Sequence, residues 1–396
     1  MLEWENGRYL EEIREMWQNN FHDPVLYTQF YFEEVYGKNR ILVNKDSEDN
    51  MRGMLHLNPY TLKVDGRPVS AHYIVGVATN EEYRRQGVMR ELLKETFSYL
   101  RNQGEAFTYL MPADEAYYLP FDFRFGMVQK EQELEYCPLT EEKNEESYSF
   151  CPEPKEFQAV CDAENAMRDA CYRIHTGISE DYLSRLGKEA KSDFARLLYV
   201  YKEYNYVGMF ILGAENDYMV VSQIVCLSQE LRNEFLGEVI KYAQSQYHYG
   251  KYQLILDETW EPVKRGTGMI DFNHILPAKE KKIIMFRLLN LEKMGEYLKS
   301  SEAHHAFLYV KDAYLSGQQG AYEWICDGSG CKITKVSEKQ PEDCDGGEIT
   351  VADLTGLLFG GLPGEETDRA EELTEKGLAL LRSIVPLRPV CIQEIV

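Results

Sequence analysis

One stretch of the sequence combines glycine with arginine where a predicted strand gives way to a predicted helix. The apolar run 75–79 favours a strand, and Glu82–Arg90 follows with two adjacent arginines and Gly87 before an amphipathic pattern begins. The first turn of a helix leaves backbone N–H groups free, and its dipole attracts anions. Glycine lets a phosphate approach the backbone, and arginine adds charge-assisted hydrogen bonds. The stretch therefore predicts a pyrophosphate-binding loop.

Other phosphate-binding loops do not match this stretch. No Gly-Lys-Ser/Thr follows, as a Walker loop requires, and the Gly-x-Gly-x-x-Gly order of dinucleotide folds is missing. A charged helix start that binds no ligand is the remaining alternative.

Two tyrosines follow the next predicted strand. The helix predicted over 86–103 and the strand predicted over 106–111 should form a right-handed crossover, which returns the end of the strand to the edge where the helix began. Tyr117 and Tyr118 would then lie near the anion site. A phenol with a pKa of about 10 stays neutral at pH 7 and can protonate a thiolate leaving group. Simple packing of either ring is the competing interpretation, because the chain has 28 tyrosines.

The overall charge argues against polyanionic partners. The 396-residue chain has 66 acidic and 43 basic side chains, a formal net charge of −23, and no long Lys/Arg block. Nucleic-acid and anionic-membrane binders usually present a basic face, so we expect neither partner and favour small cationic substrates. No apolar run reaches the roughly 18 residues of a membrane span, and the first residues do not resemble a signal peptide. We expect a cytoplasmic protein.

The cysteines predict neither a disulfide framework nor a metal site. There are nine of them, scattered along the chain, and an odd number fits a reducing compartment better. Cys326 and Cys331 are the closest pair, but no second Cys/His pair follows at zinc-finger spacing. We therefore expect ordinary thiols and no bound metal.

Apolar periodicity predicts a first domain over residues 1–140. Asp65-Gly66 between strand-like stretches 54–63 and 69–79 is typical of a β-hairpin. The charged stretch 141–146 has no apolar periodicity and predicts a linker.

The remainder of the chain predicts two further α+β domains. Residues 147–282 repeat the order of the first domain, with antiparallel strands, a helix and a strand, which suggests a diverged duplication. Residues 283–396 change pattern again and mix strands, turns and helices.

The glycine-arginine stretch is similar to motif A of the GNAT acetyltransferase superfamily, Arg/Gln-x-x-Gly-x-Gly/Ala, which holds the pyrophosphate of acetyl-CoA. Arg84 and Gly87 match the motif, whereas Met89 replaces its usual small residue. Together with Tyr27–Tyr31 and Leu110–Phe123, the stretch resembles the enhanced-intracellular-survival (Eis) family of acetyltransferases.

The resemblance extends to the end of the chain and implies a tripartite fold. The segment 352–361 is similar to the sterol-carrier-protein-like domain that closes Eis chains. The implied fold class is α+β and α/β, with tandem GNAT-fold domains, each a mixed sheet flanked by helices, before a sterol-carrier-like α+β domain. Residues 1–140 would be catalytic, 147–282 would lack the CoA motif, and 283–396 would carry a catalytic C-terminus. Eis proteins tend to form hexamers, so we expect a homo-oligomer.

The resemblance also implies the site residues. The general acid of the family matches Tyr118, because the Tyr-x-x-Phe pattern fits Tyr118–Phe121. Tyr117 stays open as the acid, since Pro120 and Asp122 replace the usual neighbours. The positions that match acetyl-CoA contacts are Val77, Ala78, Thr79, Arg84, Arg85, Gln86, Gly87, Val88, Met89, Arg90, Ala113 and Asp114.

In the Eis family the C-terminal carboxylate acts as the base, which here would be that of Val396. An α-carboxyl has a pKa of about 3.3–3.7, so it is a poor base unless burial raises that value. It can still orient the amine and take its proton late, when attack makes the nitrogen acidic. A disordered tail is the alternative, although the ending 390–396 is apolar and compact.

These features predict an N-acetyltransferase that moves acetyl from acetyl-CoA to an amine of an aminoglycoside- or polyamine-like cation, without a metal. Protein lysine is the nearest rival acceptor. A protein that only senses acetyl-CoA, or holds an apolar ligand in the third domain, is the alternative from another class. The polar, turn-rich stretch 317–345 argues against an apolar tunnel there.

Overall fold

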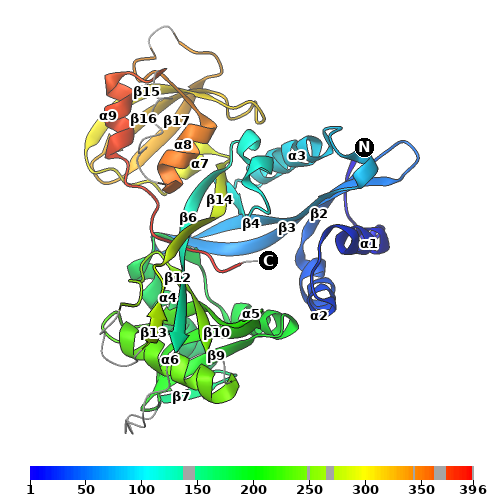
Figure 1. Ribbon diagram of the computed structural model, residues 1–396. Coiled ribbons are helices and arrows are strands. Elements are labelled where there is room, and N and C mark those ends of the chain that lie inside the picture. Colours follow the sequence, from blue (N-terminus) through cyan, green and yellow to red (C-terminus); the bar gives the residue numbers. More distant parts are fainter. Residues whose placement is uncertain (137–147, 248–249, 265–271, 342–343, 361–371, 395–396) are drawn as a thin grey trace.

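Two sheets carry most of the regular structure in this computed structural model (Figure 1). The structure describes residues 1–136, 148–247, 250–264, 272–341, 344–360 and 372–394. Within those ranges one sheet has 15 strands and the other has four. The expected linker at 141–146 lies outside the described residues.

The strands of the larger sheet are β1 (Leu2–Trp4), β2 (Arg40–Lys45), β3 (Met51–Val64), β4 (Arg67–Thr79), β5 (Phe107–Leu110), β6 (Arg124–Tyr136), β7 (Tyr148–Cys151), β8 (Ile174–Thr176), β9 (Arg196–Lys202), β10 (Asn205–Glu215), β11 (Tyr218–Cys226), β12 (Lys251–Asp257), β13 (Phe272–Ile275), β14 (Lys279–Leu288) and β19 (Val390–Cys391). The smaller sheet contains β15 (Ala303–Lys311), β16 (Gly320–Asp327), β17 (Cys331–Ser337) and β18 (Glu348–Thr350).

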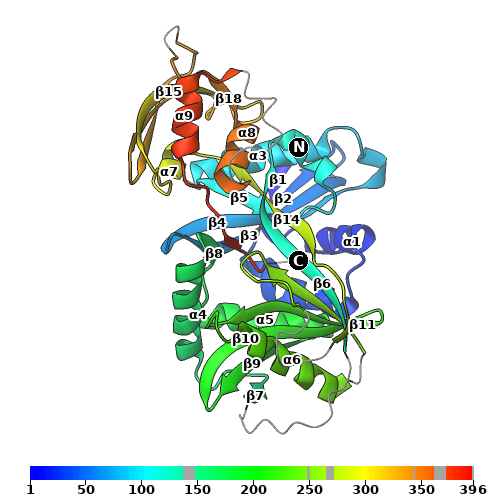
Figure 2. The same ribbon diagram turned by 60° about the vertical axis from the view of Figure 1, so that its left-hand side comes forward.

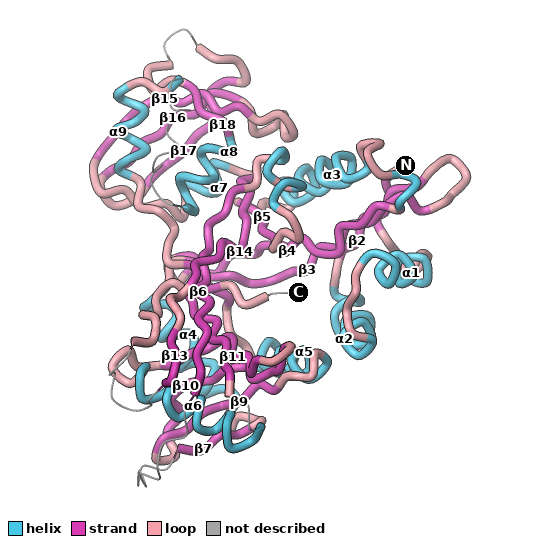
Figure 3. Tube along the Cα trace, viewed as in Figure 1, coloured by secondary structure: helices cyan, strands magenta, loops and turns pink. Residues whose placement is uncertain are grey.

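The α-helices are α1 (Leu10–Asn20), α2 (Val25–Phe30), α3 (Val88–Asn102), α4 (Phe157–Cys171), α5 (Glu180–Ser192), α6 (Arg232–Tyr247), α7 (Leu291–Gly295), α8 (Val351–Thr355) and α9 (Glu375–Ser383). Short 3₁₀ or π turns complete the helical segments: η1 (Tyr31–Val35), η2 (Tyr36–Lys38), η3 (Glu81–Tyr83), η4 (Glu115–Tyr117), η5 (Leu119–Phe121) and η6 (Gly356–Gly360). Figure 3 shows how the helices lie against the sheets. No described helix is long and apolar enough to cross a membrane.

The first unit comprises β1 to β6 with α1 to α3. Its strands β1 to β4 are antiparallel neighbours, and the β3–β4 hairpin turns at Asp65 and Gly66, both with positive φ. Such φ values suit the tight hairpin turn that the sequence predicts. Helix α3 connects β4 to β5, which run parallel, so the predicted crossover is present. One face of α3 is buried against the sheet through Leu92, Phe97 and Leu100.

Strand β14 crosses the expected domain boundary at 282–283. It lies between β5 and β6 and pairs antiparallel with both, so a late segment of the chain completes the sheet of the first unit. Its first four residues are exposed and its last six are buried. The apolar run 283–289 favours a strand, but local periodicity carries no information about which distant strand it joins.

The second unit, β7 to β12 with α4 to α6, repeats the order of the first. Strands β9, β10 and β11 are antiparallel, α6 follows, and β12 returns parallel to β11, as β2 to β5 do around α3. The long strand β6 pairs with both β14 and β12 and thereby joins the two units into one continuous sheet.

The third unit is the four-stranded sheet with α7, α8 and α9, at the upper left of Figure 1. Its buried residues, such as Leu308 and Trp324, belong to the same apolar cluster as Phe97 and Phe107 of the first unit. These two units therefore share a core.

The last described strand returns to the centre of the molecule. Strand β19 pairs parallel with β8, and β8 pairs antiparallel with β3. In Figures 1 and 2 this tail runs from the third unit between the first and second units.

Candidate active site

A β-bulge interrupts β4 at Gly76. Met54 pairs with Ala78 and His56 pairs with Val75, so Leu55 faces two residues of β4 instead of one. Gly76 has φ +60, and a Cβ there would stand 2.6 Å from Cζ3 of Trp17. A bulge leaves its extra residue out of the ladder and re-aims the backbone. The backbone N–H and C=O groups next to Val77 therefore do not follow the regular β3–β4 pairing.

Beyond this point β4 parts from β5. The two strands share one register pair, Tyr73 with Tyr109, and β5 ends at Leu110 while β4 continues to Thr79. In the second unit the matching strands β11 and β12 share three register pairs. The first unit therefore offers a longer free strand edge, next to the bulge.

The loop after β4 forms an open anion cradle at the start of α3. Arg85 and Gly87 both have positive φ, +63 and +85, and residues of this conformation are typical of backbone concavities that bind anions. Gly87 is the N-cap of α3, no side chain caps the helix, and a Cβ at Gly87 would meet nothing within 4 Å. Uncapped N–H groups with open space in front of them suit a phosphate.

The arginines of this loop have different surroundings. Arg84 donates from Nε to the carbonyl of Thr79 at 3.3 Å and from Nη2 to Oδ1 of Asn20 at 3.2 Å. It therefore ties the loop to β4 and α1. Arg85 and Arg90 are exposed, and both lie within or next to the cradle segment in the sequence.

The remaining positions matched to acetyl-CoA contacts lie on the same edge or in the same loop. Gln86 is exposed and donates to the carbonyl of Glu82 at 2.8 Å, while Val88 is buried and Met89 is half-buried. Ala113 and Asp114 are exposed, and Asp114 accepts from the backbone N–H of Ala116 at 2.9 Å. Asp114 thus fixes the turn that leads to the tyrosines.

The two candidate tyrosines point to different environments. Tyr117 is 58% exposed, whereas Tyr118 is 9% exposed and its ring packs against Phe123. Burial raises the pKa of Tyr118 to about 12, so its phenol stays protonated at neutral pH. Because β4 and β5 are parallel, the segment after β5 lies at the same sheet edge as the loop after β4.

Val396 lies outside the described residues, but the tail that leads to it is firmly held. Arg168 donates to Gln393 at 2.8 Å, Gln223 donates to the Gln393 carbonyl at 3.1 Å, and Thr176 donates to Glu394 at 2.9 Å. Gln223 has φ +47 and lies opposite Phe210 at the bulge of β11, the counterpart of Gly76 in the second unit. In the second unit this position therefore binds the tail.

A cluster of buried and half-buried polar side chains surrounds this tail, and the sequence alone did not indicate it. Buried atoms without a hydrogen-bond partner in the described part of the chain include Tyr109 Oη, Tyr182 Oη, Arg185 Nε and Glu394 Oε1. Such groups are costly when nothing satisfies them, so each implies a partner such as water or a ligand. We call Tyr60, Tyr109, Tyr182, Arg185, Glu189 and Glu394 the inner polar cluster.

A partial sequence signal for this cluster exists. Tyr182, Arg185 and Glu189 have the spacing i, i+3, i+7 and therefore share one face of α5. Glu394 is the one charged side chain within the mainly apolar ending 390–396. Neither pattern reveals that α5 and the tail meet β3 and β5.

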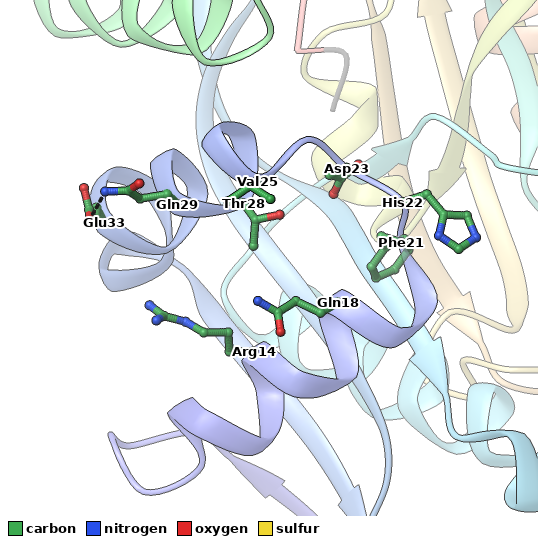
Figure 4. A pocket seen from close by; sticks show the side chains of 9 residues that line it. All are labelled: Arg14, Gln18, Phe21, His22, Asp23, Val25, Thr28, Gln29 and Glu33. Carbon is green, nitrogen blue, oxygen red and sulfur yellow. Dashed lines mark hydrogen bonds between the residues drawn. The ribbon is translucent and has the colours of Figure 1, made fainter.

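An open pocket of about 700 Å³ lies between α1 and α2 (Figure 4). Arg14 and Gln18 line it from α1, and Asp23 stands at the start of α2, where its Oδ2 accepts from Trp17 Nε1 at 2.8 Å. Trp17 also lies against the bulge glycine, so its side chain separates the pocket from β4. The other lining residues are Phe21, His22, Val25, Thr28, Gln29 and Glu33.

Cys326 and Cys331, the closest cysteines in the sequence, also lie next to each other in space. Cys326 and Cys331 are direct cross-strand partners on β16 and β17, with their Sγ atoms 2.8 Å apart. Among the described residues no group of three or more His, Cys, Asp or Glu side chains could hold a metal ion.

Comparison with known proteins identifies the first unit. Residues 6–126 match the family model of the acetyltransferase (GNAT) domain. No curated protein matches the sequence. The chain thus contains a GNAT acetyltransferase domain, and the prediction of an acetyltransferase enzyme is confirmed at this level.

Solved structures share the fold along nearly the whole chain. A conserved protein of unknown function from Enterococcus faecalis is similar with a TM-score of 0.77 at 15% identity, covering 99% of this chain and 98% of its own. A GCN5-related N-acetyltransferase from Anabaena variabilis has a TM-score of 0.74 at 14% identity, with 99% of both chains covered. Eis1 from Mycobacterium abscessus has a TM-score of 0.64 at 13% identity, covering 97% and 95%. These likenesses support the GNAT fold.

Proposed function

We propose that this GNAT acetyltransferase domain transfers acetyl from acetyl-CoA to a primary amine of a small cationic molecule by direct attack. The observation that carries the proposal is the combination of the bulge at Gly76 with the open, uncapped cradle at Gly87 on one sheet edge. One feature suits a thioester carbonyl and the other suits a pyrophosphate. Aminoglycosides and polyamines are the acceptor classes that the Eis resemblance implies.

The cradle residues provide the cofactor contacts in this proposal. Backbone N–H groups of Arg85–Met89 bind the pyrophosphate, and the guanidinium groups of Arg85 and Arg90 add charge. Arg84 holds the loop in place through Thr79 and Asn20. Backbone N–H groups at Val77–Thr79 stabilise the oxyanion that develops on the thioester carbonyl. Ala113 and Asp114 flank the path to the acid.

Two proton positions complete the mechanism. The amine nitrogen attacks the carbonyl carbon, a C–N bond forms and the C–S bond breaks. Tyr118 donates its phenolic proton to the departing thiolate, and the carboxylate of Val396 accepts the proton that the amine loses. The proton on Tyr118 is then restored from that carboxylate through solvent, so the enzyme is regenerated.

The position of the tail supports a role for Val396. Glu394, two residues before it, is 4% exposed and lies beside Tyr109 of the first unit in the electrostatic field of the inner polar cluster. Burial raises the pKa of Glu394. In this proposal, burial of the Val396 α-carboxyl would raise its pKa in the same direction and make it a better base.

The wider organisation belongs to the same proposal. We assign catalysis to residues 1–140, a scaffolding GNAT-like role to 147–282, and a sterol-carrier-like role with the catalytic C-terminus to 283–396. Strand β14 would then be an element of the third domain that completes the first sheet. A homo-oligomer, a hexamer in the Eis pattern, and a cytoplasmic location complete the proposal. Sedimentation of the purified protein tests the oligomeric state.

Release of CoA from acetyl-CoA in the presence of aminoglycosides and polyamines tests the function. A variant with three residues added after Val396 should lose at least 100-fold in kcat, because its carboxylate would be displaced from the amine. The same three residues added before Met1, which is 80% exposed, form the control and should leave turnover unchanged. Full turnover of the C-terminal variant excludes Val396, and no turnover with any amine refutes the proposed function.

A further inference from the structure

The third unit holds two thiols side by side at the end of a β-hairpin. Cys326 on β16 and Cys331 on β17 are cross-strand partners, with their Sγ atoms 2.8 Å apart. In the next pair toward the turn, the N–H of Asp327 donates to the Gly330 carbonyl at 3.2 Å. Hydrogen-bonded and non-hydrogen-bonded pairs alternate along antiparallel strands, so the cysteines occupy a non-hydrogen-bonded pair, where Cα atoms are about 4.5 Å apart. A disulfide spans Cα separations of about 4.4–6.8 Å, so the backbone already has the spacing that a bond needs.

The turn between the two strands keeps the thiols in register. Oδ1 of Asp327 accepts from the N–H groups of Ser329 and Gly330, at 2.9 and 2.8 Å, and from the Ser329 hydroxyl at 2.8 Å. Gly328 has φ +86, a conformation that glycine adopts without strain. Ser300 donates to the Gly330 carbonyl at 3.3 Å and holds the turn from outside the hairpin. The turn therefore fixes where the two sulfurs lie before any bond forms.

The two thiols differ in their access to solvent. Cys326 is 3% exposed, whereas Cys331 is half-buried and lines an open pocket of about 420 Å³. Glu292 and Gly295 line the pocket from α7, opposite β17. Helix and strand pack closely here, because a Cβ at Gly295 would stand 2.9 Å from Cγ1 of Ile333. A small solute that enters this pocket therefore meets Cys331 first.

The contact between the sulfurs favours a thiolate. The hydrogen bond from the Cys331 thiol lowers the pKa of Cys326, and a hydrogen bond from Ser300 acts in the same direction, while burial opposes both. The pKa of Cys331 is raised, because its proton is held in the hydrogen bond to Cys326. A thiolate, not a thiol, attacks a disulfide bond. Transfer of the shared proton from Cys331 to Cys326 places the thiolate on the accessible sulfur.

From this geometry we infer that Cys326 and Cys331 form a reversible dithiol–disulfide site that reacts with a low-molecular-weight disulfide such as oxidised glutathione. The Cys331 thiolate attacks one sulfur of that disulfide, forms a mixed disulfide and expels one thiolate. Cys326, as a thiolate, then attacks Sγ of Cys331, which forms the intramolecular bond and expels the second thiolate. The two leaving thiolates take up the two protons that the cysteines lose. The protein is thereby oxidised by two electrons, and the small disulfide is reduced by two.

The position of the pair favours a reversible bond over a structural one. In the chain-entropy account, a disulfide stabilises a fold by restricting the unfolded chain, and that effect is smallest for a short loop such as 326–331. The hairpin is already held by the backbone pairing of β16 with β17. A bond that adds little to the fold and lies beside an open pocket stays accessible to small thiols, which can reduce it.

Equilibration of the full-length protein with mixtures of reduced and oxidised glutathione tests the site without any acetylation assay. Trypsin cuts after Lys311 and Lys332, so one peptide, 312–332, carries both cysteines and no other. After acid quenching and alkylation, mass spectrometry should find this peptide doubly alkylated in reducing mixtures. In oxidising mixtures it should carry no alkyl group and be lighter than the dithiol peptide by two hydrogen atoms. Samples that start fully reduced and fully oxidised should converge on the same oxidised fraction.

Single variants test the order of attack. Cys326→Ser should stop at the mixed disulfide and retain one glutathione on Cys331. Cys331→Ser should react with oxidised glutathione about tenfold or more slowly, because Cys326 is buried. Cys344→Ser is the control: Cys344 is half-buried in the same unit, and its thiol donates to the Phe307 carbonyl at 3.2 Å. That variant should form the disulfide in peptide 312–332 as the wild type does.

Three results would contradict the inference. A 312–332 peptide that stays doubly alkylated at every glutathione ratio, including ratios that modify Cys344, overturns the site. A bond that excess reduced glutathione does not cleave in the folded protein overturns its reversibility. Equal rates of glutathione addition to Cys326→Ser and Cys331→Ser overturn the assigned order of attack. The first two results come from the wild-type protein, so they decide the question even if a variant fails to fold.

Discussion

Tyr117 and Tyr118 are chemically identical neighbours, yet the fold gives them different environments. The first is 58% exposed and the second is 9% exposed, with burial raising the pKa of Tyr118 to about 12. The sequence restricted the general acid to these two residues, through the Tyr-x-x-Phe pattern and the expected crossover. Which of the two faces inward depends on the turn set by Asp114 and on the packing of Phe123, which no local pattern encodes.

Tyr118→Phe should lower kcat by about 10²- to 10⁴-fold, because the thiolate would leave without a proton donor. KM for acetyl-CoA should change little, since the ring itself remains. Tyr117→Phe is the matched control and should keep kcat within twofold. Initial rates of CoA release measure both variants. Retained turnover in Tyr118→Phe together with a loss in Tyr117→Phe would reverse the assignment.

At the scale of elements, the strand-loop-helix segment around β4 and α3 carries the site. The sequence predicted the hairpin, the glycine at the helix start and the crossover, and the structure has them as β3, β4 and α3. The bulge at Gly76 was not predicted, because the close approach of Trp17 and His56, within 3.3 Å of where a Cβ at Gly76 would stand, arises only in the folded chain. The role of Arg84 likewise follows from a contact with α1 that spacing does not reveal.

Gly76→Ala should disturb both fold and catalysis. An alanine at φ +60 costs about 1–2 kcal/mol, and the contact with Trp17 adds an overpacking cost of about 1–3 kcal/mol. We expect the free energy of unfolding to fall by about 2–5 kcal/mol and kcat/KM to fall at least tenfold. Chemical denaturation and CoA release measure the two effects.

Gly104→Ala provides the control for backbone strain alone. Gly104 has φ +84 and a Cβ there would meet nothing within 4 Å, so this variant carries the conformational cost without the contact. Its unfolding free energy should fall by about 1–2 kcal/mol, with activity unchanged. Equal stability loss in the two variants would show that Trp17 moves aside at no cost.

At the scale of the whole molecule, one buried arginine joins the first unit to the third. Arg287 on β14 is fully buried, donates to the Phe121 carbonyl at 3.0 Å and to Asp312 at 2.8 Å, and lies 4.1 Å from the Phe97 ring centre. Asp122, in the turn after Tyr118, is 3.7 Å from the same guanidinium. The turn that follows Tyr118 and the third unit thus both contact the guanidinium of Arg287.

Arg287→Met should destabilise the protein by about 3–5 kcal/mol, because Asp312 would be buried without its partner. Differential scanning calorimetry measures the loss, and a limited proteolysis pattern shows whether the third unit detaches. An unchanged unfolding midpoint would contradict the proposed role of the ion pair.

Asp122→Asn tests the same cluster through pH. Burial raises the pKa of Asp122 to about 6, above the value of about 3.9 in an unfolded chain. The folded state therefore binds this proton more tightly, and the contribution of Asp122 to stability falls as pH rises from about 4 to 6. Asp122→Asn should remove that slope and leave a flatter stability profile over this window. A profile identical to the wild type would exclude Asp122 as its source.

Local sequence is enough to specify the individual elements and the chemistry of the cofactor loop. Strand periodicity, the Asp65-Gly66 turn and the Arg84–Arg90 spacing are encoded within short windows, where side-chain alternation and backbone preferences act directly. Which segments lie next to these elements depends on contacts between distant parts of the chain. The tertiary structure placed β14 between β5 and β6, and it brought α5 and the tail with Glu394 to the first sheet. Burial shifts pKa values and leaves polar atoms without partners only after such distant segments meet, so the inner polar cluster exists only in the folded chain.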